Sequence, residues 1–108
     1  MSTPEANAAK TFSALGDPTR LMLVMRLSDG QSRSIIQLSA GFNLSRQAVT
    51  KHLRVLEQAG IVQADRVGRE SRFSFVSEPI EDAQSCLAAV SQQWDEALLR
   101  LKTFLKRE

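Results

Sequence analysis

Residues 45–60 read SRQAVTKHLRVLEQAG, and this stretch decides the fold. Wound as an α-helix, it places Val49, Leu53 and Leu56 on one side, which predicts a face packed against a core. The opposite side carries no acidic residue and consists of hydrogen-bonding and basic side chains: Gln47, Thr50, Lys51 and Arg54. A short helix with such an outer face is typical of a surface that meets an anion.

The two ends of this helix are marked in the sequence. Ser45 is a favoured N-cap, because its hydroxyl can accept a hydrogen bond from a free backbone N–H of the first turn. Gly60 suits the left-handed residue that follows a helix. We therefore predict a helix over about residues 45–59, preceded by a short helix at roughly 34–41 and a turn at Phe42-Asn43-Leu44.

Two more helices are predicted nearer the N-terminus. Residues 4–15 place Ala8, Phe12 and Leu15 on one side and are followed by Gly16. Asp17 is a favoured N-cap for the next helix, with Pro18 at its first position. That helix is apolar around much of its circumference and is expected at the buried centre of the domain, through Leu21, Leu23, Val24, Met25 and Leu27.

Residues 61–76 predict a β-hairpin. Residues 61–67 and 72–76 form two short extended runs, and in the second run Phe73 and Phe75 alternate with polar residues. The polar segment 68–71 between them begins with a glycine and is predicted to be the tip. The hairpin is basic, since it carries Arg66, Arg69 and Arg72.

The last segment, about residues 79–106, predicts the longest helix. Its apolar residues recur at spacings of three and four, the heptad pattern of a helix that packs against another helix: Ile80, Ala83, Leu87, Val90, Trp94, Ala97, Leu101 and Phe104. At 1.5 Å per residue this helix is about 40 Å long, which is more than the rest of a small domain covers. We expect a second copy of the chain to cover it, with dimer contacts at Phe12, Leu87, Val90, Trp94, Ala97 and Leu101.

The length agrees with one small domain spanning 1–108. Residues 45–76 carry six Lys or Arg and three Asp or Glu, a sum of +3, compared with +1 for residues 1–44 and −2 for residues 77–108. Positive charge concentrated in this way marks a phosphate-facing surface. The sequence has no apolar run long enough to cross a membrane and no signal peptide at its start, so we expect no membrane partner and a cytoplasmic location.

The order of these elements predicts a winged helix-turn-helix: a mainly α fold with a small β-hairpin wing. An α-helix about 10–12 Å across fits the major groove of DNA, which is about 12 Å wide. Gln and Arg can form paired hydrogen bonds with base edges, whereas Lys and Arg neutralise phosphates. Double-stranded DNA is therefore the expected partner.

Three runs carry a resemblance to a known family: LGDPTRLMLVMRL, LSRQAVTKHLRVLEQAGIV and VGRESRFSF. Over roughly residues 8–77 the chain resembles the ArsR/SmtB family of bacterial winged-helix repressors. The resemblance implies a homodimer, joined through the first and last helices, that blocks transcription from a palindromic operator until an inducing signal lowers its affinity. It also implies the DNA-facing residues, which are Ser45, Arg46, Gln47, Thr50 and Lys51, with Arg54 at the backbone and Arg69 and Arg72 in the wing.

The sequence departs from the metal-sensing members of that family. Where those members have a cysteine pair on the helix before the turn, this chain has Ser34 and Ile36, and neither replaces a thiolate ligand. Its one histidine, His52, lies in the recognition helix, where we expect packing or a phosphate contact. We therefore predict no metal site, no cofactor and no metal response. The sequence does not identify an inducer or show that one exists, and an unknown small molecule is one candidate.

Several alternatives stay open from the sequence. The pattern W..AL..LK..L around Trp94 is similar to a non-metal branch of the family, and Trp94 either packs in the dimer seam or lines a small-molecule pocket. Cys86 is either a half-buried small residue or a redox switch across the dimer. The predicted function is a homodimeric, sequence-specific DNA-binding repressor; the alternative is a winged-helix protein-interaction module without specific DNA binding. An enzyme is not expected, because no catalytic constellation or phosphate-binding loop is present.

Overall fold

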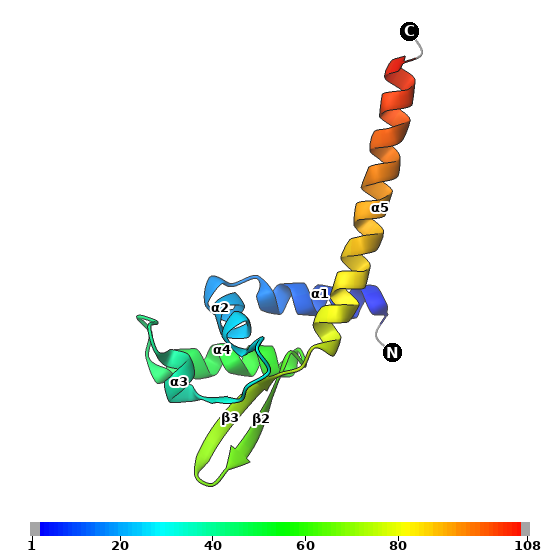
Figure 1. The fold of residues 1–108 in the computed structure, drawn as a ribbon. Helices are drawn as coiled ribbons and strands as arrows, with labels where there is room; N and C mark the ends of the chain where they lie inside the picture. Colours follow the sequence, from blue (N-terminus) through cyan, green and yellow to red (C-terminus); the bar gives the residue numbers. More distant parts are fainter. Residues whose placement is uncertain (1–2, 107–108) are drawn as a thin grey trace.

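The computed structural model describes residues 3–106 and shows a mainly helical chain with a small sheet (Figure 1). The predicted fold class is confirmed. In chain order the elements are α1 (Pro4–Leu15), α2 (Pro18–Leu27), β1 (Arg33–Ser34), α3 (Ile35–Ser39), α4 (Arg46–Gln58), β2 (Val62–Val67), β3 (Glu70–Phe75) and α5 (Glu78–Lys106).

The core lies where α2, α3, α4 and the sheet meet. The three apolar residues of α4, namely Val49, Leu53 and Leu56, are fully buried, as their helical spacing predicted. They pack in one cluster with side chains from each of the other elements, including Leu23, Leu27, Leu38, Ile61 and Phe73. Burial of a Leu or Phe side chain stabilises a fold by about 1.5–3 kcal/mol, so this cluster fixes the position of α4 in the domain.

The hairpin is tighter than the sequence suggested. Strands β2 and β3 pair antiparallel as far as Val67 and Glu70, so the turn contains only Gly68 and Arg69. Gly68 has φ of 65°, a left-handed conformation that a glycine adopts without a steric penalty. Arg69 consequently lies at the tip of the wing.

The sheet also has a third strand that the sequence did not reveal. Residues Arg33 and Ser34 pair antiparallel with Phe73 and Arg72, which gives the strand order β1-β3-β2. Two residues are too few to show a strand's alternation, and the predicted helix at 34–41 included Ser34. The observed helix α3 begins one residue later because Ser34 is its N-cap.

The expectation that α2 is buried on most sides was wrong. Leu23, Val24 and Leu27 are buried, but the side chains of Leu21 and Met25 are 44% and 60% exposed. The helix packs on α4, α1 and β3 with one face, and within residues 3–106 its outer face stays exposed.

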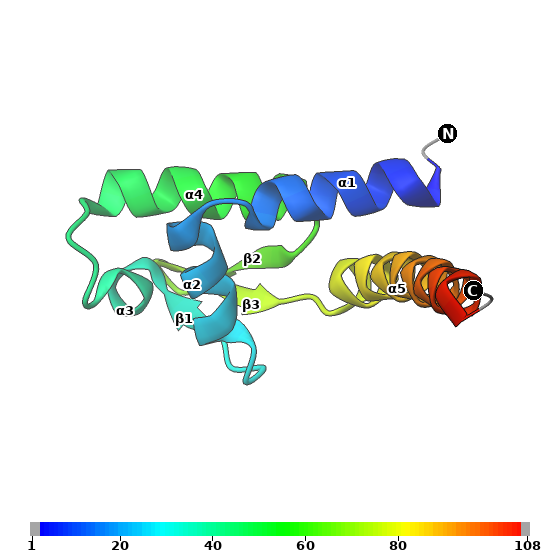
Figure 2. The same cartoon turned by 90° about the horizontal axis from the view of Figure 1, so that it is seen from above.

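Helix α5 leaves the body of the domain and projects away from it (Figure 1). Its first turns lie beside α1, and Ala83 is its one buried residue. Beyond that contact the heptad positions are uncovered, including Leu87, Val90, Leu101 and Trp94, which is 66% exposed. Seen along α5, helix α4 and strands β2 and β3 lie to one side of it (Figure 2). From Leu87 onward, the apolar stripe that the sequence predicted therefore has no partner within residues 3–106 of its own chain.

Candidate nucleic-acid interface

Helix α4 begins as the sequence predicted. The Ser45 hydroxyl accepts a hydrogen bond from the Ala48 N–H at 3.1 Å, and the helix starts at Arg46. Thr50 donates its hydroxyl proton to the Arg46 carbonyl at 2.7 Å, which holds its side chain close to the helix. The first turn has no acidic residue to offset the positive end of the helix dipole.

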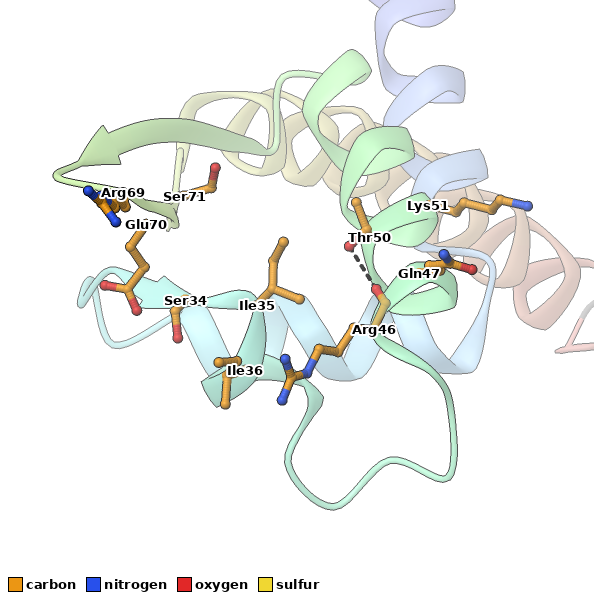
Figure 3. A pocket seen from close by; sticks show the side chains of 10 residues that line it. All are labelled: Ser34, Ile35, Ile36, Arg46, Gln47, Thr50, Lys51, Arg69, Glu70 and Ser71. Atoms are coloured by element: carbon orange, nitrogen blue, oxygen red, sulfur yellow. Dashed lines mark hydrogen bonds between the residues drawn. The ribbon is translucent and has the colours of Figure 1, made fainter.

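An open groove of about 640 Å³ lies between α3, α4 and the wing (Figure 3). Five predicted DNA-facing residues line it: Arg46, Gln47, Thr50 and Lys51 from α4, and Arg69 from the wing tip. The other lining residues are Ser34, Ile35, Ile36, Glu70 and Ser71. The fold thus brings together two sequence segments that are about twenty positions apart.

The groove carries net positive charge. Three cationic side chains, those of Arg46, Lys51 and Arg69, line it against one carboxylate, that of Glu70. The ion pairs found among residues 3–106 involve none of these three cations, whereas the Glu70 carboxylate is paired with Arg72 at 3.1 Å. An anion that entered the groove would meet cations that are not neutralised by the protein itself.

Three predicted DNA-facing residues lie outside the groove lining. Ser45 is occupied as the N-cap of α4. Arg54 is exposed and pairs with Glu57 on the next turn at 3.2 Å. Arg72 donates from Nε to the Ser32 hydroxyl at 3.1 Å, from Nη2 to the Ser32 carbonyl at 2.8 Å and from Nη1 to Glu70. These contacts tie β3 to the loop before β1.

The groove also contains residues that sequence reasoning did not assign to it. Ile36 has 59% of its surface exposed and lies beside Arg46, so an apolar side chain borders the cationic surface (Figure 3). Its exposure had no sequence signal, because Ile35 and Ile36 are adjacent in a five-residue helix that is too short to show which of them faces the core.

Ser34, which stands at one of the cysteine positions of metal-sensing relatives, caps helix α3. Its hydroxyl accepts from the Gln37 N–H at 3.2 Å, and the Gln37 side chain accepts from the Ser34 N–H at 2.9 Å, which forms a capping box. In the part of the chain that the structure describes, no group of three or more His, Cys, Asp or Glu side chains is placed to hold a metal ion.

His52 faces away from the groove. Its ring is about three-quarters buried, with Nδ1 3.4 Å from Arg20 Nη1 and 3.7 Å from Asp17 Oδ2. Asp17 itself caps α2 by accepting from the N–H groups of Thr19 and Arg20, and the hydrogen bond from Arg20 N–H lowers the pKa of the Asp17 carboxyl. Of the two roles expected for His52, this position agrees with packing.

Comparison with known proteins agrees with this geometry. The model of the bacterial regulatory protein family arsR matches residues 17–64, which run from the N-cap of α2 into β2. A structure described as an ArsR-like transcriptional regulator from Rhodococcus sp. RHA1 superposes with a TM-score of 0.77 at 32% identity, over 93% of each chain. The chain belongs to the ArsR family.

Relatives of this ArsR-family chain are described as transcriptional regulators. The HTH-type transcriptional regulator YuzN of Bacillus subtilis is 34% identical over 82 residues, which is 70% of this chain and 89% of that protein. A transcriptional repressor SmtB homolog of Synechocystis is 39% identical over 66 residues, which is 61% of this chain and 49% of that protein.

The chain is thus a DNA-binding transcriptional regulator of the repressor type and not an enzyme. Among residues 3–106, no helix is both long and apolar enough to cross a membrane.

Proposed function

We propose that the protein is a homodimeric repressor that binds a palindromic operator, with α4 in the major groove and the wing on the adjacent backbone or minor groove. The observation that carries this proposal is the convergence of α4 and the wing tip on one groove whose three cations have no ion-pair partner in the described chain. We take the protein to act in the cytoplasm, without a membrane partner or cofactor.

Within the groove we assign roles by side-chain chemistry. Gln47 and Arg46 are exposed near the start of α4 and can form paired hydrogen bonds with adenine and guanine edges respectively. Lys51 and Arg69 suit phosphates, since a cation at the groove's edge releases counterions whatever the base sequence. Thr50 offers a methyl group to the bases, because its hydroxyl is held by the Arg46 carbonyl.

Residues outside the groove lining have supporting roles in this proposal. Ser45 sets the start of α4, and Arg54 reaches the DNA backbone by exchanging Glu57 for a phosphate. Arg72 either holds the wing through Ser32 and Glu70 or contacts DNA, and the two roles make different predictions about salt dependence.

The uncovered stripe of α5 supports the homodimer. Phe12 on α1 and Leu87, Val90, Trp94 and Leu101 on α5 are each more than a third exposed, and Ala97 is half-buried among them. Heptad spacing matches the geometry of a helix packed against a second helix, so a partner's α1 and α5 fit this surface. Two copies related by a two-fold axis present two recognition helices, which is why a palindromic operator is expected.

The inducing signal is proposed to be something other than a metal ion. Ser34 is used as a helix cap and Ile36 has no donor atom, so the α3 positions offer no ligand pair. A small molecule between protomers near Trp94, or oxidation of the half-buried Cys86, remains the alternative signal.

A selection experiment tests the proposal. The wild-type protein would be used to enrich duplexes from a random-sequence pool, and the enriched duplex and a scrambled one would be titrated by fluorescence anisotropy. Specific sites bind about 10³–10⁷-fold more tightly than non-specific DNA, so a preference in that range with two protomers per duplex is expected. No enrichment, with equal and weak binding to both duplexes, would favour the protein-interaction module instead.

A matched pair of glutamine variants tests the groove assignment. Gln47→Ala removes a predicted base contact, which is worth about 1–3 kcal/mol of discrimination, and should relax sequence preference at one position of each half-site. Gln58→Ala changes the same residue type at the other end of α4, away from the groove, and should bind as the wild type does. Equal behaviour of the two variants would contradict the assignment.

A further inference from the structure

One arginine of α2 connects three helices. Arg20 donates from Nε to the Ala14 carbonyl at 2.6 Å and from Nη2 to the Ser13 carbonyl at 3.4 Å, so its guanidinium holds the last turn of α1. The remaining nitrogen, Nη1, lies 3.4 Å from Nδ1 of His52 on the recognition helix. A single side chain therefore contacts both the helix predicted to lie in the dimer interface and the helix predicted to read DNA.

The chemistry of this contact defines how His52 must act. An arginine can only donate hydrogen bonds, so a hydrogen bond at this contact requires the His52 tautomer in which Nδ1 is the acceptor and the proton is on Nε2. The side chain of His52 is 25% exposed, and His52 directly follows Lys51, which lines the groove. Asp17 Oδ2 lies 3.7 Å from the same nitrogen and accepts the backbone N–H of Arg20, which keeps the start of α2 close to this pair.

Apolar packing fixes which face of α4 is buried, and a directional contact can define the rotation of the helix more finely. Its three buried residues, Val49, Leu53 and Leu56, contact the core through interactions that have little directional preference. A hydrogen bond weakens steeply as its angle departs from linearity, so a bond from Arg20 to one flank of α4 resists rotation about the helix axis. Such a rotation would displace Gln47 and Lys51, which line the groove.

We propose that Arg20 and His52 form a positioning pair that sets the orientation of α4 relative to α1, and through it the geometry of the DNA-binding groove. This proposal rests on the proposed role of α4 in reading DNA. It adds a contact between α2 and α4 that lies outside the groove. Because Arg20 holds the end of α1, a change in the way two protomers pack would reach α4 through this contact.

Two substitutions at His52 separate the hydrogen bond from simple packing. Asn has an amide oxygen where His has Nδ1, so His52→Asn keeps an acceptor for Arg20, whereas Leu in His52→Leu fills similar space and accepts nothing. With the duplex enriched by the wild-type protein, we expect His52→Leu to bind at least about tenfold more weakly and His52→Asn to bind within about threefold of the wild type. The temperature of unfolding of both variants would be recorded in the same buffer.

The outcomes are distinct. Wild-type affinity in His52→Leu, or equal weakening in both variants, would overturn the positioning pair while leaving the repressor proposal intact. If the wild-type protein enriches no duplex, the repressor proposal fails, and the pair is then tested by nitrogen-15 NMR. His52 is the one histidine in the sequence, so its ring signals need no assignment. Arg20→Met should move the Nδ1 signal to lower field as it loses its donor, and an unchanged signal would refute the contact.

Discussion

Two arginines of the wing, three residues apart, are expected to respond differently to the same substitution. Arg69 lies at the hairpin tip and lines the groove, and it forms none of the ion pairs found in residues 3–106. Arg72 donates to Ser32 and Glu70. Replacing each with Ala therefore removes a free cation in one case and an internal crosslink in the other.

The magnitude follows from the number of cations assigned to phosphates. Each protomer contributes Lys51 and Arg69 from the groove, and Arg54 once it has exchanged Glu57 for a phosphate, which gives six phosphate-neutralising cations in a proposed dimer. The slope of log affinity against log salt is about −0.9 per phosphate, so the wild-type slope should be about −5.4 and the Arg69→Ala slope about −3.6. Between about 50 and 200 mM salt, the wild type should lose about 2,000-fold in affinity and Arg69→Ala only about 150-fold.

Fluorescence anisotropy at four salt concentrations would measure these slopes on the enriched duplex. Arg72→Ala should keep a slope near that of the wild type, because the lost contacts are internal to the protein. A fall in its slope equal to that of Arg69→Ala would show that Arg72 leaves Ser32 and Glu70 to bind phosphate. An unchanged slope in Arg69→Ala would refute the reasoning, since the wing tip would then lie away from the DNA.

Two further predictions concern the dimer and acid stability. If α5 forms the proposed dimer seam, Leu101→Glu should raise the dissociation constant of the dimer by at least about tenfold, because it places one unpaired charge from each protomer there. Lys102→Glu changes a residue outside the heptad positions and should leave the dissociation constant unchanged. Sedimentation equilibrium would measure both variants. The Arg33 guanidinium, 2.6 Å from Asp29, holds the pKa of the Asp29 carboxyl well below its usual value of 3.8, so this group contributes stability that is present above pH 3.8 and is lost as pH falls further. The temperature of unfolding of Asp29→Asn should therefore be lower than that of the wild type near neutral pH and approach it below pH 3.8, and a constant difference between pH 7 and pH 3 would contradict the ion pair.

The recognition helix was predictable because its signals are local. The sequence predicted an N-cap at Ser45 and a buried face at helical spacing. Both are observed: Ser45 caps the helix, and the buried residues are Val49, Leu53 and Leu56. The groove residues were predictable for the same reason, since the exposed face of a helix is the complement of its buried face. The long helix α5 was predictable from the regular spacing of its apolar residues, whereas the dimer seam stays a prediction.

The structural roles of three other arginines were not predictable, because their contacts join residues that are distant in sequence. Arg72 and Ser32 are forty positions apart, and Arg20 and His52 thirty-two. Arg26 donates to the Leu38 carbonyl and lies over the Phe42 ring at 4.3 Å, which fixes α3 and the turn to α2. In a sequence, each of these arginines is simply one more positive charge.

The internal contacts of these arginines change how the positive charge of residues 45–76 is interpreted. Residues 45–76 contain six cations, but Arg54 and Arg72 have carboxylate partners and three others line the groove. The charge available to DNA is therefore smaller than the sequence count, and it is concentrated at α4's first turns and the wing tip. A repressor must also release its operator. If a few exposed cations and the orientation of one helix set the affinity for DNA, a change in that orientation can lower it. A rotation of α4 that moved Gln47 and Lys51 away from Arg69 would weaken specific contacts without changing the charge of the protein.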